Sequence, residues 1–333
     1  MTAATYDVLG IGNAIVDILA KTEDKFLTEQ GMAKGSMALI DEARAAAIYD
    51  AMGPATEISG GSAANTIAGV ANFGARAAFV GKVRNDQLGN VFSHDIRAAG
   101  VAFNTQAASS GPATARCYVL VSPDGERTMN TYLGAAQDLS PADIDPAQIA
   151  ASSIVYLEGY LWDPANAKEA FLKASKIAHE NKRSVALTLS DAFCVGRYHD
   201  EFLNLIRSKT VDLVFANEAE LTSLYQTEDF DKALAQLRND ATLAVVTRSE
   251  KGCVVVAKDK VTPVPAFPIK QLVDTTGAGD LFAAGFLFGL VRGLSHEQCG
   301  RFGVLAAAEV IQHIGARPQA SLKTLAKEAG LPV

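Results

Sequence analysis

The chain contains few cysteines and histidines, and this scarcity excludes several kinds of protein. Its four cysteines, Cys117, Cys194, Cys253 and Cys299, form no CxxC pair, and its five histidines are dispersed. A structural zinc site needs such ligands at short, regular spacing, so none is predicted. Scattered cysteines are typical of proteins kept in a reducing compartment. We therefore expect reduced, mostly structural cysteines and a cytoplasmic location.

The sequence also lacks basic clusters and long hydrophobic runs. It carries 30 Lys and Arg against 37 Asp and Glu, which gives a formal net charge of -7 at pH 7. Neither a nucleic acid nor an anionic membrane is therefore an expected partner. No apolar run approaches the length of a transmembrane helix, and no basic segment followed by an apolar stretch marks a signal peptide. A small phosphate-bearing ligand stays compatible with this charge, because helix ends supply local positive potential.

The 333 residues, 49% of them hydrophobic, are enough for one large α/β domain with an appendage or for two ordinary domains. Short β-rich runs alternate with helical patterns along most of the chain. Strands are predicted over residues 6–12, 77–80, 154–157, 185–189, 213–216, 243–247 and 253–256, and helices over residues 65–72, 88–99 and 165–180. Short, unbroken apolar strands between helices indicate a parallel sheet covered on both faces. We therefore predict an α/β fold with a doubly wound, mostly parallel sheet flanked by helices.

Two segments, at about 15–41 and 102–137, break this alternation. The second contains two β-rich runs, residues 115–121 and 127–132, on either side of a Pro-Asp-Gly turn, which predicts a β-hairpin. We predict that both segments form a small β-sheet that acts as a lid on a single domain spanning residues 1–333. The exposed edge of such a sheet can pair with a second subunit, so a monomer and a homodimer through the lid both stay open.

A Pro-rich connection, residues 262–268, leads into the most informative motif of the chain, DTTGAGD at residues 274–280. Its two glycines let the backbone come close to a ligand, and their N–H groups open a helix whose N-terminus favours an anion. Asp280 lies just past the glycines, inside the first turn. A phosphate cradle that holds a carboxylate indicates phosphoryl transfer. The alternative for the motif alone is a Gly-rich turn with an acidic first helical turn.

Two further segments carry candidate contacts to an acceptor molecule. Asn13 and Asp17 follow the first strand, at the end of a parallel sheet where ligands bind, and can hydrogen-bond vicinal hydroxyls of a sugar. The second segment is a Gly-rich helix start that permits close ligand approach. It comprises Gly60, Gly61, Ser62 and, one turn into the helix, Asn65. A turn Asn with a solvated Asp, and helix–sheet packing through small residues, are the respective alternatives.

Asn217 and Glu220 follow the strand at 213–216 and face the same way on a helix, because they are three residues apart. Such a pair can hold a hydrated Mg²⁺ through water, since Mg²⁺ keeps several waters and needs few carboxylates. An N-cap Asn with an acidic first turn is the alternative.

The turn at 247–252 can line a nucleotide phosphate or be a plain turn. No GxxxxGK followed by Ser or Thr occurs, and Ile15 replaces the third glycine of a dinucleotide-binding motif, which disfavours Walker-type and NAD-binding proteins.

Taken together, these motifs resemble the ribokinase-like carbohydrate kinases, the PfkB family. The resemblance covers residues 7 to about 318 and rests most strongly on the DTTGAGD motif. It implies a ribokinase-like fold and an ATP-dependent phosphotransferase with an alcohol acceptor, with Mg²⁺ as cofactor and ATP as co-substrate. In the family's pattern Asp280 is the catalytic base, and the backbone of Gly277, Ala278 and Gly279 forms the anion hole.

The resemblance also implies the ligand contacts. It is nearest to the adenosine-phosphorylating members, which implies the 5′-hydroxyl of adenosine as acceptor; a sugar such as ribose or fructose is the alternative. The acceptor is then expected at Asn13, Asp17, Gly60, Gly61, Ser62 and Asn65, with its base against Leu133, Ala135 and Phe193. ATP is expected at Asn217, Glu220, Thr247, Ser249, Gly252, Thr276, Gly277 and Gly279, with Mg²⁺ bound to Glu220 through water. K⁺ near Asp274 and Thr276 is left open.

Overall fold

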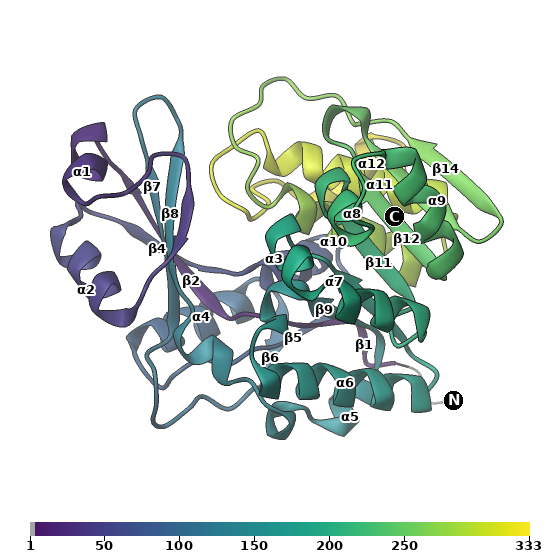
Figure 1. The fold of residues 1–333 in the computed structure, drawn as a ribbon, viewed down its shortest axis with the longest axis horizontal. Helices are drawn as coiled ribbons and strands as arrows, with labels where there is room; N and C mark the ends of the chain where they lie inside the picture. The colour runs from purple at the N-terminus through teal and green to yellow at the C-terminus, as the bar shows by residue number, and fades with distance from the viewer. Residues whose placement is uncertain (1–3) are drawn as a thin grey trace.

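The computed structural model describes residues 4–333, which form two β-sheets flanked by helices (Figure 1). The large sheet consists of β1 (Tyr6–Ile11), β5 (Ala77–Val80), β6 (Val101–Phe103), β9 (Ser152–Glu158), β10 (Ser184–Thr188), β11 (Leu213–Asn217), β12 (Leu243–Thr247), β13 (Cys253–Ala257) and β14 (Lys260–Val264). Its strand order is β14-β13-β12-β11-β10-β9-β1-β5-β6. Neighbouring strands from β6 to β12 run parallel, and β13 and β14 add antiparallel at one edge. The predicted α/β fold with a mostly parallel sheet is confirmed.

Helices cover both faces of the large sheet, which is why its strands are near-continuous apolar runs. The helices are α1 (Asp24–Glu29), α2 (Glu42–Ala51), α3 (Ser62–Asn72), α4 (Gln87–Ala98), α5 (Pro146–Ala150), α6 (Ala165–Glu180), α7 (Ala192–Arg207), α8 (Glu218–Leu224), α9 (Phe230–Asp240), α10 (Ala278–Val291), α11 (His296–Val310) and α12 (Leu322–Glu328). Successive residues of β1 serve opposite cores: Val8 packs in the cluster that includes α3, α10 and α11, and Leu9 in the cluster of α6 and α7. Within residues 4–333, no helix has both the length and the apolar character that membrane crossing requires.

The Pro-rich stretch at 262–268 differs from its prediction as a connection. Its first residues belong to the edge strand β14, in which Pro263 lies opposite Val254 of β13. Proline lacks the N–H that a central strand needs, but an edge strand tolerates it on the side that faces no neighbour. The prediction was therefore wrong for residues 262–264, because proline marks a strand's edge position as well as its end.

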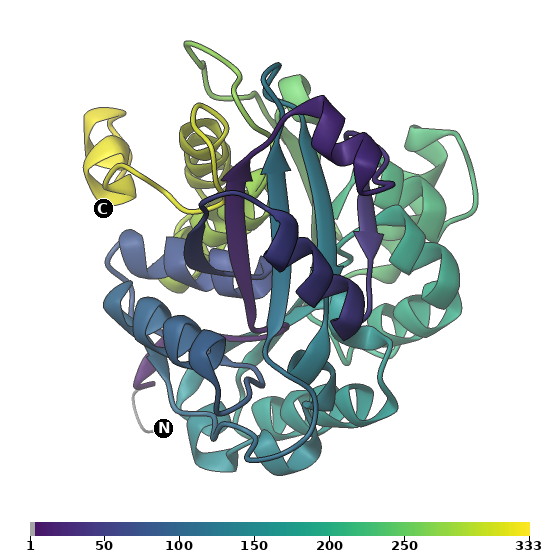
Figure 2. The ribbon, with the colours of Figure 1, turned by 90° about the vertical axis from the view of Figure 1, so that its left-hand side faces the viewer.

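The small sheet stands apart from the large one, at the left of Figure 1. It consists of β2 (Ile15–Lys21), β3 (Met37–Leu39), β4 (Thr56–Gly60), β7 (Ala115–Val121) and β8 (Arg127–Tyr132), in the order β3-β8-β7-β2-β4. β7 and β8 pair antiparallel, so the predicted hairpin is confirmed. In Figure 2, which views the molecule from this side, α2 lies across the strands and covers their outer face.

The strands of the small sheet alternate between two environments. In β2, Val16 and Ile18 are buried, whereas Ile15, Asp17 and Leu19, which alternate with them, are partly exposed. Because successive side chains of a strand point to opposite faces, the second set faces away from the buried side of the sheet. Those three residues line the space between the two sheets.

Candidate active site

A cavity of about 410 Å³ lies where the two sheets meet. One side comprises the ends of β10, β11 and β12 together with the first turns of α3 and α10. The predicted residues that line this cavity are Asp17, Gly61, Ser62, Asn65, Asn217, Glu220, Thr247, Thr276, Gly277, Ala278, Gly279 and Asp280. The fold therefore brings residues from five separate segments of the sequence into one space.

Asp280 is held by side chains from the facing helix. Ser62 Oγ donates to Asp280 Oδ1 at 2.6 Å, and Asn65 Nδ2 donates to Asp280 Oδ2 at 3.0 Å. Burial raises the pKa of Asp280, while these two hydrogen bonds and the charge of Arg317 lower it. The carboxylate is therefore fixed in orientation at the first turn of α10, where N–H groups favour negative charge.

The glycine loop before α10 has a shape that its sequence requires. Gly277 is the N-cap of α10 and has φ of 78°, in the left-handed region that favours glycine. A Cβ on Gly277 would lie 2.7 Å from the Cβ of Ala316. Residues 277–279 line the cavity, and the N–H of Ala278 donates to the carbonyl oxygen of Thr275 at 3.2 Å.

Asp274 is engaged by the loop itself and by the small sheet. Its carboxylate accepts hydrogen bonds from the backbone N–H of Thr276 at 3.0 Å and of Gly315 at 3.1 Å. Arg127, from β8, reaches across to it, with 2.5 Å between Arg127 Nη2 and Asp274 Oδ2, and donates through Nη1 to Thr276 Oγ at 3.0 Å. The monovalent cation near Asp274 and Thr276 stays a prediction.

The acceptor side of the site contains a carboxylate and two amide oxygens without partners. Asp17 packs against Gly60, whose hypothetical Cβ would lie 2.3 Å from Asp17 Oδ2, and burial raises the pKa of Asp17 to about 7. The Oδ1 atoms of Asn13 and Asn65 are buried, and no donor among residues 4–333 reaches either of them. Unpaired buried acceptors of this kind fit the hydroxyl groups of a polyol or a ribose.

Glu158 orders this side of the site, and sequence reasoning missed it. Asn13 does not line the cavity but donates from Nδ2 to Glu158 Oε1 at 2.6 Å, and the N–H of Ala63 donates to Glu158 Oε2 at 2.8 Å. Burial raises the pKa of Glu158 to about 7. The available signal was its place directly after the predicted strand 154–157, where parallel strands present functional side chains.

The residues expected around a base lie elsewhere. Leu133, Ala135 and Phe193 do not line the cavity. The chain turns away after β8, so Ala135 is fully buried, and Phe193 is 72% exposed with the Arg197 guanidinium 4.7 Å from its ring centre. The apolar lining comes instead from the small sheet, as a surface that we call the apolar wall: Ile15, Leu19, Ile58, Val119 and Met129.

On the other side of the cavity, Asn217 and Glu220 form a capping box at the start of α8. The N–H of Glu220 donates to Asn217 Oδ1 at 2.8 Å, and Asn217 Nδ2 donates to Glu220 Oε1 at 2.6 Å. Burial raises the pKa of Glu220 to about 7. Each carboxylate oxygen keeps a second lone pair, so the pair fits a hydrated Mg²⁺ held through water. Ser249 and Gly252 lie beyond the lining residues.

Candidate metal ligands do not cluster within the described part of the chain. No group of three or more His, Cys, Asp and Glu residues that could hold an ion occurs in residues 4–333. The four cysteines are all buried and unpaired. A protein-only metal cage is therefore absent from the described residues.

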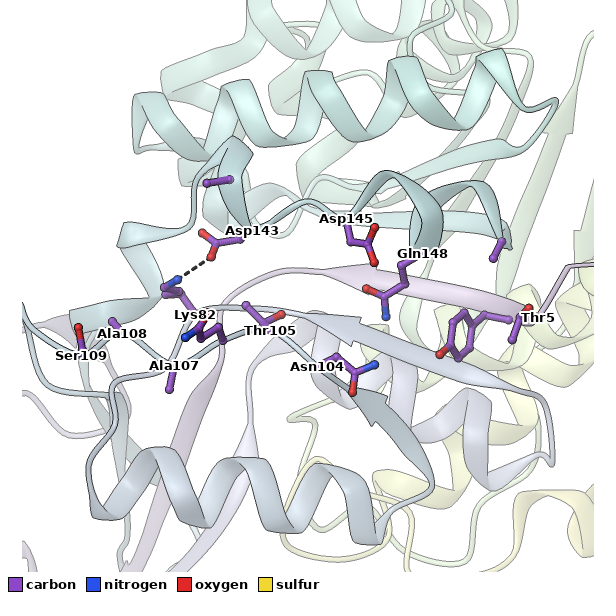
Figure 3. Close-up of a pocket in the computed structure, with 14 residues that line it drawn as sticks. Thr5, Lys82, Asn104, Thr105, Ala107, Ala108, Ser109, Asp143, Asp145 and Gln148 are labelled. Atoms are coloured by element: carbon purple, nitrogen blue, oxygen red, sulfur yellow. Dashed lines mark hydrogen bonds and ion pairs between the residues drawn. The ribbon is translucent and has the colours of Figure 1, made fainter.

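A second cavity, of about 790 Å³, lies away from these residues, between β6, α5 and the start of β1 (Figure 3). Its labelled side chains are mostly polar, and Lys82 Nζ pairs with Asp143 Oδ1 at 2.5 Å. None of the predicted site residues lines it. The candidate chemistry therefore belongs to the smaller cavity between the sheets.

Comparison with known proteins gives a consistent set of relatives. Residues 49–323 match the pfkB family carbohydrate kinase. The adenosine kinase from Sinorhizobium meliloti has a TM-score of 0.92 and 56% identity, covering 98% of this chain and 100% of that chain. A probable sugar kinase protein from Rhizobium etli CFN 42 has a TM-score of 0.93 and 52% identity, covering 99% and 100%. Adenosine kinase 2 of Arabidopsis thaliana is 29% identical over 343 residues, 94% of this chain and 96% of that protein.

Proposed function

Because the chain belongs to the pfkB family of carbohydrate kinases, we propose that it transfers the γ-phosphoryl group of ATP to the 5′-hydroxyl of adenosine. The family and its ribokinase-like fold make the chain an ATP-dependent phosphotransferase with an alcohol acceptor. The choice of adenosine is the further step, and it rests on the lining of the cavity. Adenosine kinases among the relatives support it.

The observation that carries the proposal is that the apolar wall and the polar residues around Asp280 line the same cavity. Ile15, Leu19 and Met129, among others, line one side of the cavity, and Asp280 lies at the other. A purine base can bury its faces against such a wall, whereas a free sugar has hydroxyl groups on most of its surface. The wall therefore favours a nucleoside over ribose or fructose.

Asp280 is the proposed base. It accepts the proton of the attacking hydroxyl, and the bonds from Ser62 and Asn65 hold its oxygens in place. Its raised pKa is no obstacle, because the proton moves late in a loose phosphoryl-transfer transition state. The N–H groups of residues 277–279 stabilise the charge on the transferring group, and one such donor contributes about 3–4 kcal/mol in comparable sites.

The remaining polar residues position the two substrates. Asp17 and the unpartnered Oδ1 atom of Asn65, which line the cavity, accept hydrogen bonds from ribose hydroxyls. Glu220 would hold Mg²⁺ through water, and the ion supplies neutralisation of phosphate charge when bound. Thr247 and Thr276 line the same space and accompany the nucleotide.

The small sheet is the proposed lid of a single catalytic domain, and its closure excludes water and so suppresses hydrolysis of ATP. Arg127 already links this sheet to the glycine loop through Asp274 and Thr276. The buried, unpaired cysteines support the expected reducing, cytoplasmic compartment.

A sugar kinase that uses the same catalytic residues is the second candidate, supported by the relative from Rhizobium etli CFN 42 described as a probable sugar kinase. ADP release with Mg²⁺-ATP against adenosine, inosine, ribose and fructose separates the two. We expect turnover with adenosine and a loss of about 100-fold or more in Asp280→Asn. Turnover of ribose or fructose alone would reassign the acceptor, and Asp280→Asn at wild-type rate would remove the proposed base.

A further inference from the structure

A short segment after α11 connects the glycine loop to the small sheet. The N–H of Gly315 donates to Asp274 Oδ2, and Ala316 packs against Gly277. Arg317 then extends to β4, where its Nη2 donates to both the carbonyl oxygen and the Oγ of Ser59 at 3.0 Å. Three consecutive residues thus contact the catalytic loop on one side and Ser59 of β4 on the other.

The Arg317 guanidinium is buried with unmade hydrogen bonds. Its Nε and Nη1 atoms are buried, and no acceptor in residues 4–333 lies within reach of them. Burial lowers the pKa of Arg317 to about 10, against the charges of Asp95, Asp17 and Asp280, which raise it. A buried cation without its full set of partners is costly, so a chain that keeps one gains something from its charge.

Ser59 is fixed from two sides by opposite charges. Asp95, from α4, accepts a hydrogen bond from the N–H of Ser59 at 2.7 Å, and Arg317 donates to its carbonyl and hydroxyl oxygens. Ser59 is 1% exposed and directly precedes the Gly60-Gly61 pair at which the small sheet joins α3. The position of β4 relative to α10 therefore depends on Arg317.

We propose that Arg317 is a positioning residue of the transfer reaction, which ties Ser59 to the catalytic loop and provides the positive charge shared by Asp17 and Asp280. This inference rests on the proposed function, in which Asp17 holds the acceptor and Asp280 accepts its proton. The charge of Asp280 raises the pKa of Asp17, and the positive charge of Arg317 lowers the pKa of both carboxyl groups. Both roles need the ionised form, so the shared charge matters for activity.

Other titratable groups face this cluster and belong to every element packed around it. They are Asp95 on α4, Cys117 on β7, Arg127 on β8, Tyr156 and Glu158 on β9, and Tyr160 just after β9. Arg127 acts on Asp17, whereas Arg317 acts on both Asp17 and Asp280. Removal of Arg317 therefore leaves Asp280 without that support.

Two substitutions separate the charge of Arg317 from its hydrogen bonds. Arg317→Gln keeps an N–H donor for Ser59 and removes the charge, whereas Arg317→Lys keeps the charge. The matched control is Arg207→Gln, which removes a surface ion pair with Asp240, and neither residue of this pair lines the cavity. The measurement is kcat/KM for the acceptor as a function of pH, because its acidic limb reports essential groups of the free enzyme.

We expect Arg317→Gln to move the acidic limb to higher pH by about one unit, since a nearby opposite charge shifts a carboxyl pKa by roughly that amount or more. Arg317→Lys should keep the wild-type limb but raise KM for the acceptor, and Arg207→Gln should match the wild type. Circular dichroism and thermal unfolding confirm that each variant is folded.

The outcomes distinguish this inference from the function on which it rests. A folded Arg317→Gln with the wild-type acidic limb would overturn the role of the charge. If that variant does not fold, Arg317→Lys decides alone: a displaced limb despite a retained charge, or an unchanged KM, would contradict the proposal. A wild-type protein that releases ADP with none of the acceptors would instead refute the proposed function, and this inference with it.

Discussion

At the scale of single residues, the two glycines of the phosphate loop have different tasks. Gly277 combines a φ of 78° with backbone contact to Ala316, so any side chain there strains the fold. Gly279 lies in the first turn of α10, and a Cβ on it would meet nothing within 4 Å. The first glycine is therefore required by the protein, and the second is required only by a ligand that comes close.

Alanine at each position tests this difference. Gly277→Ala should lower the free energy of unfolding by about 2 kcal/mol, from left-handed strain and the clash with Ala316. Gly279→Ala should leave stability within about 0.5 kcal/mol, because the position is open and helical. Its kcat/KM should nevertheless fall by about 100-fold, because the new methyl group displaces the phosphate from the N–H donors. Urea unfolding and steady-state kinetics measure the two effects.

Two outcomes would contradict these expectations for the glycine variants. Equal losses of stability in the two variants would mean that Gly279 also serves the fold. A Gly279→Ala enzyme with wild-type kcat/KM would mean that no phosphate approaches the start of α10 closely.

At the scale of elements, the residues at the start of α8 have two roles, because they cap the helix and also line the cavity. Asn217 and Glu220 satisfy the first N–H groups of the helix through a capping box, and both line the cavity. α11 begins with an equivalent box, formed by Ser295 and Gln298. The second box does not belong to the cavity lining, so it isolates the purely structural contribution.

Loss of either cap should cost similar stability but affect Mg²⁺ differently. Asn217→Ala and Ser295→Ala should each lower the free energy of unfolding by about 1 kcal/mol. Asn217→Ala alone should raise the Mg²⁺ concentration needed for half-maximal activity, because Glu220 loses the partner that orients it. Titration of activity with Mg²⁺ at saturating ATP measures this. Identical Mg²⁺ dependence in the two variants would reduce the motif to a helix cap.

The strands of the large sheet were predictable from sequence, because a strand buried on both faces consists of an unbroken run of apolar residues. β12 and the β7–β8 hairpin have the predicted bounds, the latter through its Pro-Asp-Gly turn. β4 was not predicted, since Thr56–Gly60 carries polar and small residues without a clear alternation. Its pairing with β2 depends on tertiary contacts that no local pattern expresses.

The candidate site was predicted in part, for a related physical reason. Motifs such as DTTGAGD are contiguous, so their residues could be named before the fold was known. The apolar wall consists of alternate residues from separate strands. The sequence does not show which of the two alternating sets of side chains on each strand faces the cavity. Arg127 and Arg317 act across long sequence separations, and an isolated arginine gives no signal of that.

At the scale of the whole molecule, the site works against stability. Burial raises the pKa of Asp17, Glu158 and Glu220 to about 7 in the folded protein. Between their ordinary values near 4 and the raised values, the folded state binds more protons than the unfolded state. The free energy of unfolding should therefore fall as pH rises through this window. Carboxyl groups with lowered pKa values, such as Asp229, act in the opposite sense, but below pH 4.

Thermal unfolding at a series of pH values tests this. Tm should be higher near pH 5 than near pH 8, because protonated carboxyl groups are cheaper to bury. Glu220→Gln keeps the capping geometry and removes one of the three groups, so its Tm should depend less on pH. The exposed Glu29→Gln is the control and should retain the wild-type slope. A wild-type Tm that rises from pH 5 to pH 8 would contradict the assignment.

The division of the cavity between two sheets has a consequence for how such a protein can change. Asp280, the glycine loop and the α8 start belong to the large sheet and its helices, whereas the apolar wall belongs entirely to β2, β4, β7 and β8. If the function is as proposed, the residues of the reaction and the residues that select the acceptor belong to separate parts of one chain. Substitutions confined to a few inward-facing strand positions can retarget the enzyme while the chemistry stays intact.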